Sequence, residues 1–170
     1  MIIERGMVMQ NEIFWGKSIN ELHEIAGCEK TERATLYELV NFAQSQRAAL
    51  DPIVFLGLLR IIAENKSADG QLLDHVCDIA LSEVKEQREG LNYGCLQMLF
   101  KNIASNLNTE SVTFKKLLDN KIHVREYIVE NPSLSDELLL YIVENTRNNE
   151  ILAIAAKQLA TRYKAVLNKK

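Results

Sequence analysis

A helix–asparagine–turn–helix segment at residues 122–145 recurs in degraded form elsewhere in the chain, and this repetition constrains the fold more than any other feature. The segment reads IHVREYIVENPSLSDELLLYIVEN. When the chain is shifted by 25 residues, 102–106 and 114–120 align with 127–131 and 139–145 of this segment. When it is shifted by 66 residues, 61–65 and 72–76 align with 127–131 and 138–142. A unit that recurs in this way is typical of stacked helical arrays. We therefore predict short helices that pair across tight turns and share one core.

Glycine and proline are placed as a helical chain requires. The seven glycines all lie at or before Gly94, and the two prolines are Pro52 and Pro132. The 76 residues after Gly94 therefore contain no glycine and one proline. Few places remain for hairpin turns, which favours helices over strands.

Capping residues and apolar spacing locate the predicted helices. Ser18 and Glu21 form a capping box before a short helix, and Asp51-Pro52 is a clear helix start. The helix over 52–64 is apolar on most of its circumference, so it needs cover on more than one side. The other predicted helices begin at Thr31 and span 69–90, 91–105, 109–120, 121–131, 135–145 and 149–167.

Asparagine ends several of these helices, at Asn65, Asn106, Asn131 and Asn145. Asparagine tolerates the left-handed backbone conformation that stops a helix, so we predict that conformation at these positions. After Asn131, Pro132 prevents the helix from continuing, and Ser133 or Ser135 starts the next one.

Residues 124–139 resemble the repeat unit of bacterial leucine-rich repeat variant proteins, which belong with the armadillo and HEAT α-solenoids. The match consists of Val124-Arg125, then Ile-Val-Glu-Asn-Pro at 128–132, then the run that ends at Leu139. The resemblance covers about 122–160 well and 100–120 in part. It implies stacked antiparallel helix pairs and, most often, a protein-binding surface, with no catalytic residue.

We therefore expect an all-α fold of about eight or nine helices, either a HEAT/armadillo-like α-α superhelix or an irregular helical bundle. Uneven spacing of the units and longer helices in the N-terminal half keep the bundle as an alternative. The absence of a low-complexity linker predicts a single domain over 1–170, with 1–17 as an N-terminal cap or a poorly ordered segment.

The overall charge does not favour a nucleic-acid partner. The net charge is −3 and the pI is about 5.7, whereas a dedicated binder usually has a basic domain with a pI above ~9. The charge is uneven, however. Residues 1–90 carry 15 acidic and 9 basic side chains, and residues 91–170 carry 8 and 11.

The three cysteines form no CxxC pair, and their number is odd, which predicts free thiols in a reducing compartment. Whether they have a redox role is left open. His75 and Cys77 are two positions apart, so on a helix they point roughly 200° away from each other. Cys77 is therefore predicted to be a packing residue. A metal site of His23 and Cys28, with Cys95 or His123, lacks the paired ligand spacing of structural zinc sites. We predict no catalytic, cofactor or metal residue, and keep an enzyme or metal protein with a Cys/His site as the second alternative function.

The N-terminal sequence MIIERGMVMQNEIF has a glutamate at position 4 and no apolar run of signal-peptide length. No stretch approaches the ~18–20 apolar residues needed to cross a bilayer. We therefore expect a cytoplasmic protein that does not span a membrane. Met1, Met7 and Met9 are alternative starts.

The candidate partner-binding residues are a basic group and one tryptophan. The basic group, expected to line one ridge near Tyr127, consists of Lys115, Lys116, Lys121, His123 and Arg125. It suits an acidic peptide or phosphate, but the favoured interpretation is a solvated face whose Lys and Arg pair with Asp119 and Glu126. Trp15 is either a hydrophobic cap or an anchor for a partner or a homodimer through the N-terminal apolar segment. We predict a non-enzymatic protein-interaction adaptor, with a nucleic-acid-binding protein that uses the Lys115–Arg125 group as the alternative.

Overall fold

The computed structural model describes residues 14–86 and 90–167, and within these ranges every regular element is a helix. The helices are α1 (Ile19–Gly27), α2 (Arg33–Ser45), α3 (Pro52–Glu64), α4 (Gly70–Glu86), α5 (Tyr93–Ser105), α6 (Ser111–Asp119), α7 (Arg125–Glu130), α8 (Asp136–Asn145) and α9 (Asn149–Leu167). The predicted all-α class is confirmed. The alternative start methionines and residues 1–13 of the predicted N-terminal cap lie outside the described residues, whereas Phe14 and Trp15 of the apolar segment lie within them.

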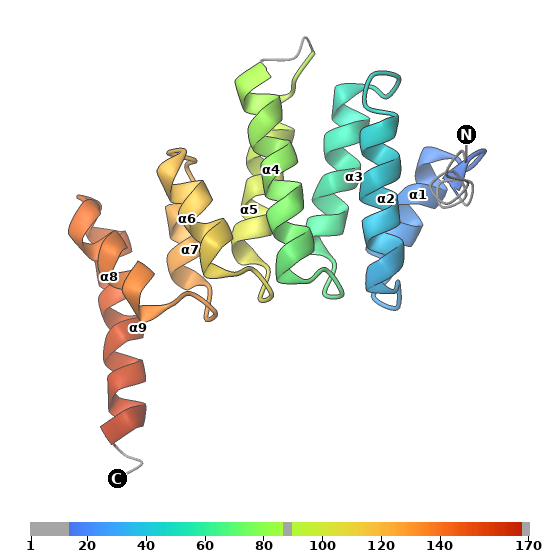
Figure 1. Cartoon of the computed structure of the whole chain (residues 1–170). Helices are drawn as coiled ribbons and strands as arrows, with labels where there is room; N and C mark the ends of the chain where they lie inside the picture. Colours follow the sequence, from blue (N-terminus) through green and yellow to red (C-terminus); the bar gives the residue numbers. More distant parts are fainter. Residues whose placement is uncertain (1–13, 87–89, 168–170) are drawn as a thin grey trace, which may run out of the picture.

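The helices form two layers. The odd layer consists of α1, α3, α5, α7 and α9, each packed against the next. The even layer consists of α2, α4, α6 and α8, of which α2, α4 and α8 pack on the odd layer and α6 packs on α4. Figure 1 shows the helices running alternately up and down, so that the α1–α2, α3–α4, α5–α6 and α7–α8 turns lie along the lower edge.

The most apolar helix lies at the centre of the N-terminal half, as its sequence predicts. α3 packs against α1, α2, α4 and α5, and six of its residues are buried, including Phe55, Leu56 and Leu59. Its start is set locally, because the Asp51 carboxylate accepts a hydrogen bond from Ile53 N at 2.8 Å.

The predicted capping box of Ser18 and Glu21 is also present at the start of α1. Several other predicted boundaries differ by a few residues. α2 begins at Arg33 rather than Thr31, because the Thr31 hydroxyl donates to Ile25 O at 2.6 Å and belongs to the turn. α7 is the largest difference. It begins at Arg125 rather than at Lys121, whose φ of +56° is left-handed and incompatible with a continuing right-handed helix.

The prediction of left-handed asparagines at the helix ends is wrong. Asn65, Asn106 and Asn131 have φ values of −67°, −68° and −72°, and Asn145 is the last residue of α8 itself. The only non-glycine residue with positive φ in the described part of the chain is Lys121. The asparagines must therefore be explained by their side chains.

Asn65, Asn106 and Asn131 form an asparagine ladder that ties each odd-layer helix to the next. The side-chain amide of each donates to two carbonyls: that of the capping residue of the preceding odd-layer helix and that of the residue two positions earlier. The donor–acceptor distances, with the capping residue first, are 2.9 and 2.7 Å for Asn65, 3.2 and 2.8 Å for Asn106, and 2.8 and 2.9 Å for Asn131. Each Oδ1 accepts from the backbone N–H two residues later. The ladder thus gives a hydrogen-bond donor to the helix-end carbonyls of Ala26, Ala63 and Ala104. It adds a second donor to the capping carbonyls, which also accept from the backbone N–H three residues later.

The ladder is modified at both ends. Cys28 caps α1 at the first position, and its carbonyl accepts from Asn65 although its own side chain offers no amide. At the other end, Gln158 lies inside α9, and its Nε2 donates to Val129 O, two positions before Asn131. Between α7 and α9, therefore, the side-chain amide that ties the two helices comes from a glutamine inside a helix and not from an asparagine at a helix end.

Polar side chains also connect the even-layer helices at the N-terminal end. Arg47, in the turn after α2, pairs with Glu83 of α4 and, at 2.5 Å, with Glu86. Glu83 is fully buried, whereas the Arg47 side chain is 33% exposed. The hydrogen bonds that Arg47 donates to both carboxylates raise its pKa above its usual value.

Candidate functional site

The turns after α6 and α8 enclose a surface hollow of ≈ 490 Å³ with a basic lining. We call it the basic hollow. Its lining residues are Lys121, Ile122, His123, Arg125, Glu126, Thr146, Arg147, Asn148 and Ile151. The α6–α7 and α8–α9 turns lie at the edge of the array opposite the asparagine ladder, at the C-terminal end (Figure 1).

Short-range hydrogen bonds fix the two turns that carry the cations. In the first turn, Ile122 N donates to Leu117 O at 3.1 Å, and Val124 N donates to Ile122 O at 2.9 Å. In the second turn, the side-chain oxygen Oδ1 of Asn148 accepts a hydrogen bond from Glu150 N at 2.9 Å and caps the start of α9. Each turn therefore holds its charged residues on a defined backbone.

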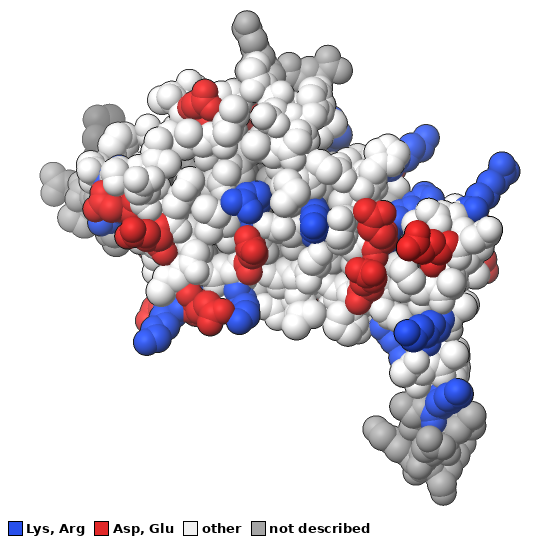
Figure 2. Space-filling view, turned by 180° about the vertical axis from the view of Figure 1, so that it is seen from behind, with Lys and Arg blue, Asp and Glu red and all other residues white. Residues whose placement is uncertain are grey.

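The cations of the basic hollow have no carboxylate partner. Over the described residues, no ion pair involves Lys121, Arg125 or Arg147, and Arg125 Nη1 makes only a long 3.5 Å contact to Asn145 O. Figure 2 shows Lys and Arg side chains projecting at the upper right, over the end of the molecule formed by α6–α9, with Asp and Glu side chains below them on the same end and both kinds of charge across the centre of that face.

Several cations elsewhere in the array are held in ion pairs between helices. Lys116 of α6 binds Asp74 and Asp78 of α4, each at 2.8 Å. Burial lowers the pKa of Lys116, but the hydrogen bonds from the two aspartates outweigh this and raise it above its usual value. Lys116 therefore fastens two even-layer helices and is not available to a partner.

The remaining residues of the predicted basic group do not lie together on one ridge. Lys121, His123 and Arg125 line the basic hollow. Lys115 is exposed on α6 and does not line the hollow. Tyr127 is covered by Lys101 of α5, whose Nζ lies 4.7 Å from the ring centroid.

Trp15 lies at the opposite end of the array. Its ring makes an edge contact with Phe42 at 5.8 Å between centroids, and the side chain stays 59% exposed. The neighbouring Phe14 is 1% exposed and packs on the same Phe42 at 5.6 Å. Phe14 therefore covers α2, and Trp15 lies only partly over it.

Arg147 contributes to the basic hollow although nothing in its local sequence marks it. The available signal was the offset of 25 residues, which places Thr146–Asn148 over Lys121–His123. Since equivalent turns of stacked units lie side by side, this offset brings Arg147 to the same hollow as Lys121.

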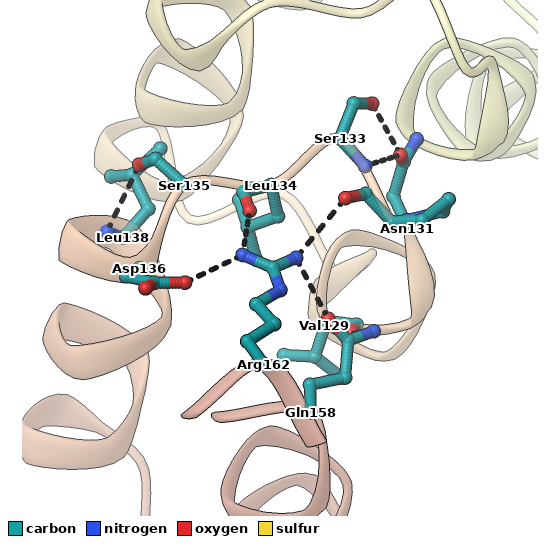
Figure 3. Close-up of polar contacts among 10 residues, drawn as sticks. Val129, Asn131, Ser133, Leu134, Ser135, Asp136, Leu138, Gln158 and Arg162 are labelled. Atoms are coloured by element: carbon teal, nitrogen blue, oxygen red, sulfur yellow. Dashed lines mark hydrogen bonds and ion pairs between the residues drawn. The ribbon is translucent and has the colours of Figure 1, made fainter. Parts of the chain in front are cut away.

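A second hollow, of ≈ 350 Å³, lies between the end of α7 and the outer part of α9. Its arginine is already occupied, as Figure 3 shows. The guanidinium of Arg162 donates to Leu134 O at 2.6 Å and Pro132 O at 3.1 Å, and it pairs with Asp136 at 2.7 Å. Arg162 therefore fastens α9 to the α7–α8 turn, whereas the exposed Lys157, which also lines this hollow, forms no ion pair within the described residues.

Cys77 and His75 of α4 lie in different surroundings. Cys77 is buried, as predicted, and burial raises the pKa of its thiol to about 12. The His75 ring contacts Gln44 Oε1 at 3.2 Å. In the part of the chain that the structure describes, no group of three His, Cys, Asp or Glu side chains is placed to hold a metal ion.

None of the described helices combines the length and the apolar character needed to span a bilayer. No protein family, curated protein or solved structure was found to match the chain.

Proposed function

We propose that this chain is a non-enzymatic interaction module that binds an acidic segment of a protein partner in the basic hollow. The observation that carries the proposal is that Lys121, Arg125 and Arg147 form no ion pair within the described residues, whereas Arg47, Lys116 and Arg162 are held in ion pairs within the array. Side-chain charges that form no ion pair within the protein remain available to a ligand.

A protein segment suits the size and charge of this site better than a nucleic acid. The cations converge on one hollow rather than along a stripe, and the chain has a net charge of −3. Nucleic-acid binding depends on neutralising many phosphates, and each neutralised phosphate steepens the salt dependence of affinity. A nucleic-acid-binding protein is the alternative function. This alternative requires that the protein bind a nucleic-acid strand longer than the hollow, with an affinity that falls steeply as the salt concentration rises.

Fluorescence anisotropy with a labelled glutamate-rich peptide tests the proposal, with a matched glutamine-rich peptide as the ligand control. We expect binding of the acidic peptide only, and a loss of about tenfold in affinity for Arg147→Gln. Arg33→Gln is the protein control, because it removes the same charge from an arginine on α2 that is 66% exposed and pairs with Asp69. Equal affinities of the Arg147→Gln variant and the unmodified protein would count against the proposal.

An enzyme or metal protein built on the cysteines and histidines is the second alternative. Elemental analysis of the purified protein, together with His75→Ala and Cys95→Ala variants, distinguishes it. Stoichiometric metal that is lost in either variant would favour this alternative over the interaction module.

A further inference from the structure

We infer that the basic hollow takes a dianionic phosphate monoester borne on a side chain of the partner. This inference rests on the proposed function and narrows its ligand from any acidic segment to a phosphorylated one.

The charge balance of the basic hollow matches a dianion. Lys121, Arg125 and Arg147 supply three positive charges and Glu126 one negative charge, which leaves +2 with His123 neutral. A phosphorylated serine, threonine or tyrosine carries about −1.5 to −2 at pH 7. A glutamate side chain or a phosphodiester carries only one negative charge, so either would leave about half of the site uncompensated.

The donors approach the hollow from separate segments. Arg147 belongs to the α8–α9 turn, Arg125 begins α7, and Lys121 lies in the α6–α7 turn. Two guanidinium groups offer forked pairs of N–H donors that suit phosphate oxygens, and a lysine amine adds a point charge. A volume of ≈ 490 Å³ lies within the roughly 300–1,000 Å³ of ligand pockets, so a phosphorylated side chain with adjacent backbone can enter.

The backbone of Lys121 has a conformation in which glycine is the usual residue. Its φ is +56°, in the left-handed region where a side chain is strained. A lysine at this position lines the hollow and forms no ion pair over the described residues. The Lys121→Gly variant therefore removes the amine while it relaxes the backbone, which separates loss of binding from loss of folding.

The test compares one acidic peptide in three forms that differ at a single central residue: serine, phosphoserine and glutamate. Isothermal titration calorimetry at low salt gives the affinity of the full-length protein for each form. Inorganic phosphate alone and a single-stranded thymidine oligonucleotide are the remaining ligands. The protein variants are Arg147→Gln and Lys121→Gly, with Arg33→Gln as the control for net charge.

We expect the phosphoserine peptide to bind about tenfold more tightly than the glutamate peptide. Arg147→Gln and Lys121→Gly should each weaken it by about tenfold, and Arg33→Gln by less than about twofold. Equal affinities for phosphoserine and glutamate would overturn the inference of a dianion and leave the proposed function standing. If neither acidic form binds, the proposed function fails as well.

Two further results would overturn the inference by naming another ligand. Inorganic phosphate that binds as tightly as the phosphoserine peptide would make the ligand free phosphate rather than a partner side chain. An oligonucleotide that binds more tightly than the phosphoserine peptide would assign the hollow to nucleic acid. Phosphate that competes only at much higher concentration than the peptide supports a peptide-borne monoester.

Discussion

Replacing Asn131 with alanine removes the last asparagine of the ladder. Its Nδ2 donates to Ala104 O at 2.9 Å and to Asn106 O at 2.8 Å, and its Oδ1 accepts from Ser133 N at 2.9 Å. Asn131 is only 3% exposed, so water does not readily replace these bonds. Ala104 O and Ser133 N lose these partners, whereas Asn106 O keeps a hydrogen bond from Thr109 N. The loss of three hydrogen bonds to the backbone, at about 1 kcal/mol each, should lower the free energy of unfolding by about 3 kcal/mol.

Urea unfolding followed by far-UV circular dichroism measures this loss, and a thermal scan should show a Tm lowered by about 6–12 °C for a protein of this size. Asn131→Asp should be at least as destabilising, since it keeps the acceptor but places an oxygen against two carbonyls. The control is Asn145→Ala. Asn145 bonds only Tyr141 O of its own helix and is exposed, so the change should cost less than about 0.5 kcal/mol.

The ordering of these variants decides whether the ladder holds the odd layer together. If Asn131→Ala were no more destabilising than Asn145→Ala, the amide contacts between units would contribute nothing beyond an ordinary helix end. The same conclusion would follow if Asn131→Asp were as stable as the unmodified protein, because the two donors would then be dispensable.

Three further predictions concern other parts of the array. Arg47→Met should lower the free energy of unfolding by about 3–5 kcal/mol because it leaves the buried Glu83 charge unpaired, and adding Glu83→Leu should restore much of the loss in the same urea assay. Because its thiol pKa is about 12, Cys77 should resist iodoacetamide at pH 8 in the folded protein, whereas the exposed Cys28 should react. Mass spectrometry of the peptides measures both reactions, and rapid labelling of Cys77 would contradict its burial. Lys121→Gly should change the free energy of unfolding by no more than about 1 kcal/mol, because relief of left-handed strain offsets the greater entropy of glycine in the unfolded chain; a larger loss would mean that the lysine side chain supports the fold.

The parts of the fold that depend on neighbouring residues could be predicted from the sequence. The α3 start at Asp51-Pro52 and the capping box at Ser18 use contacts within three residues, so the motif contains the whole interaction. The helical class followed from the recurring unit and from the absence of glycine after Gly94. Element boundaries shifted where a side chain such as that of Thr31 bonds the turn instead of opening a helix.

Contacts between units could not be derived in the same way. Asn106 acts on carbonyls about 40 residues earlier in the chain, so its position at a helix end suggested a local backbone role that it does not have. Lys116 stands beside Lys115 in the sequence, yet its partners Asp74 and Asp78 lie on another helix. The sequence signal for such neighbours is the alignment of copies by offset, which places Arg147 over the turn that contains Lys121.

The binding of a phosphoserine peptide, mapped residue by residue in ¹H–¹⁵N NMR spectra, tests the central claim about this protein most directly. We predict that the backbone signals that move cluster at residues 121–126 and 146–151, around the basic hollow. Signals of the asparagine ladder on the opposite edge, such as that of Asn65, should not move. Perturbations centred on the ladder edge or on α1–α3, or none at saturating peptide, would contradict the account.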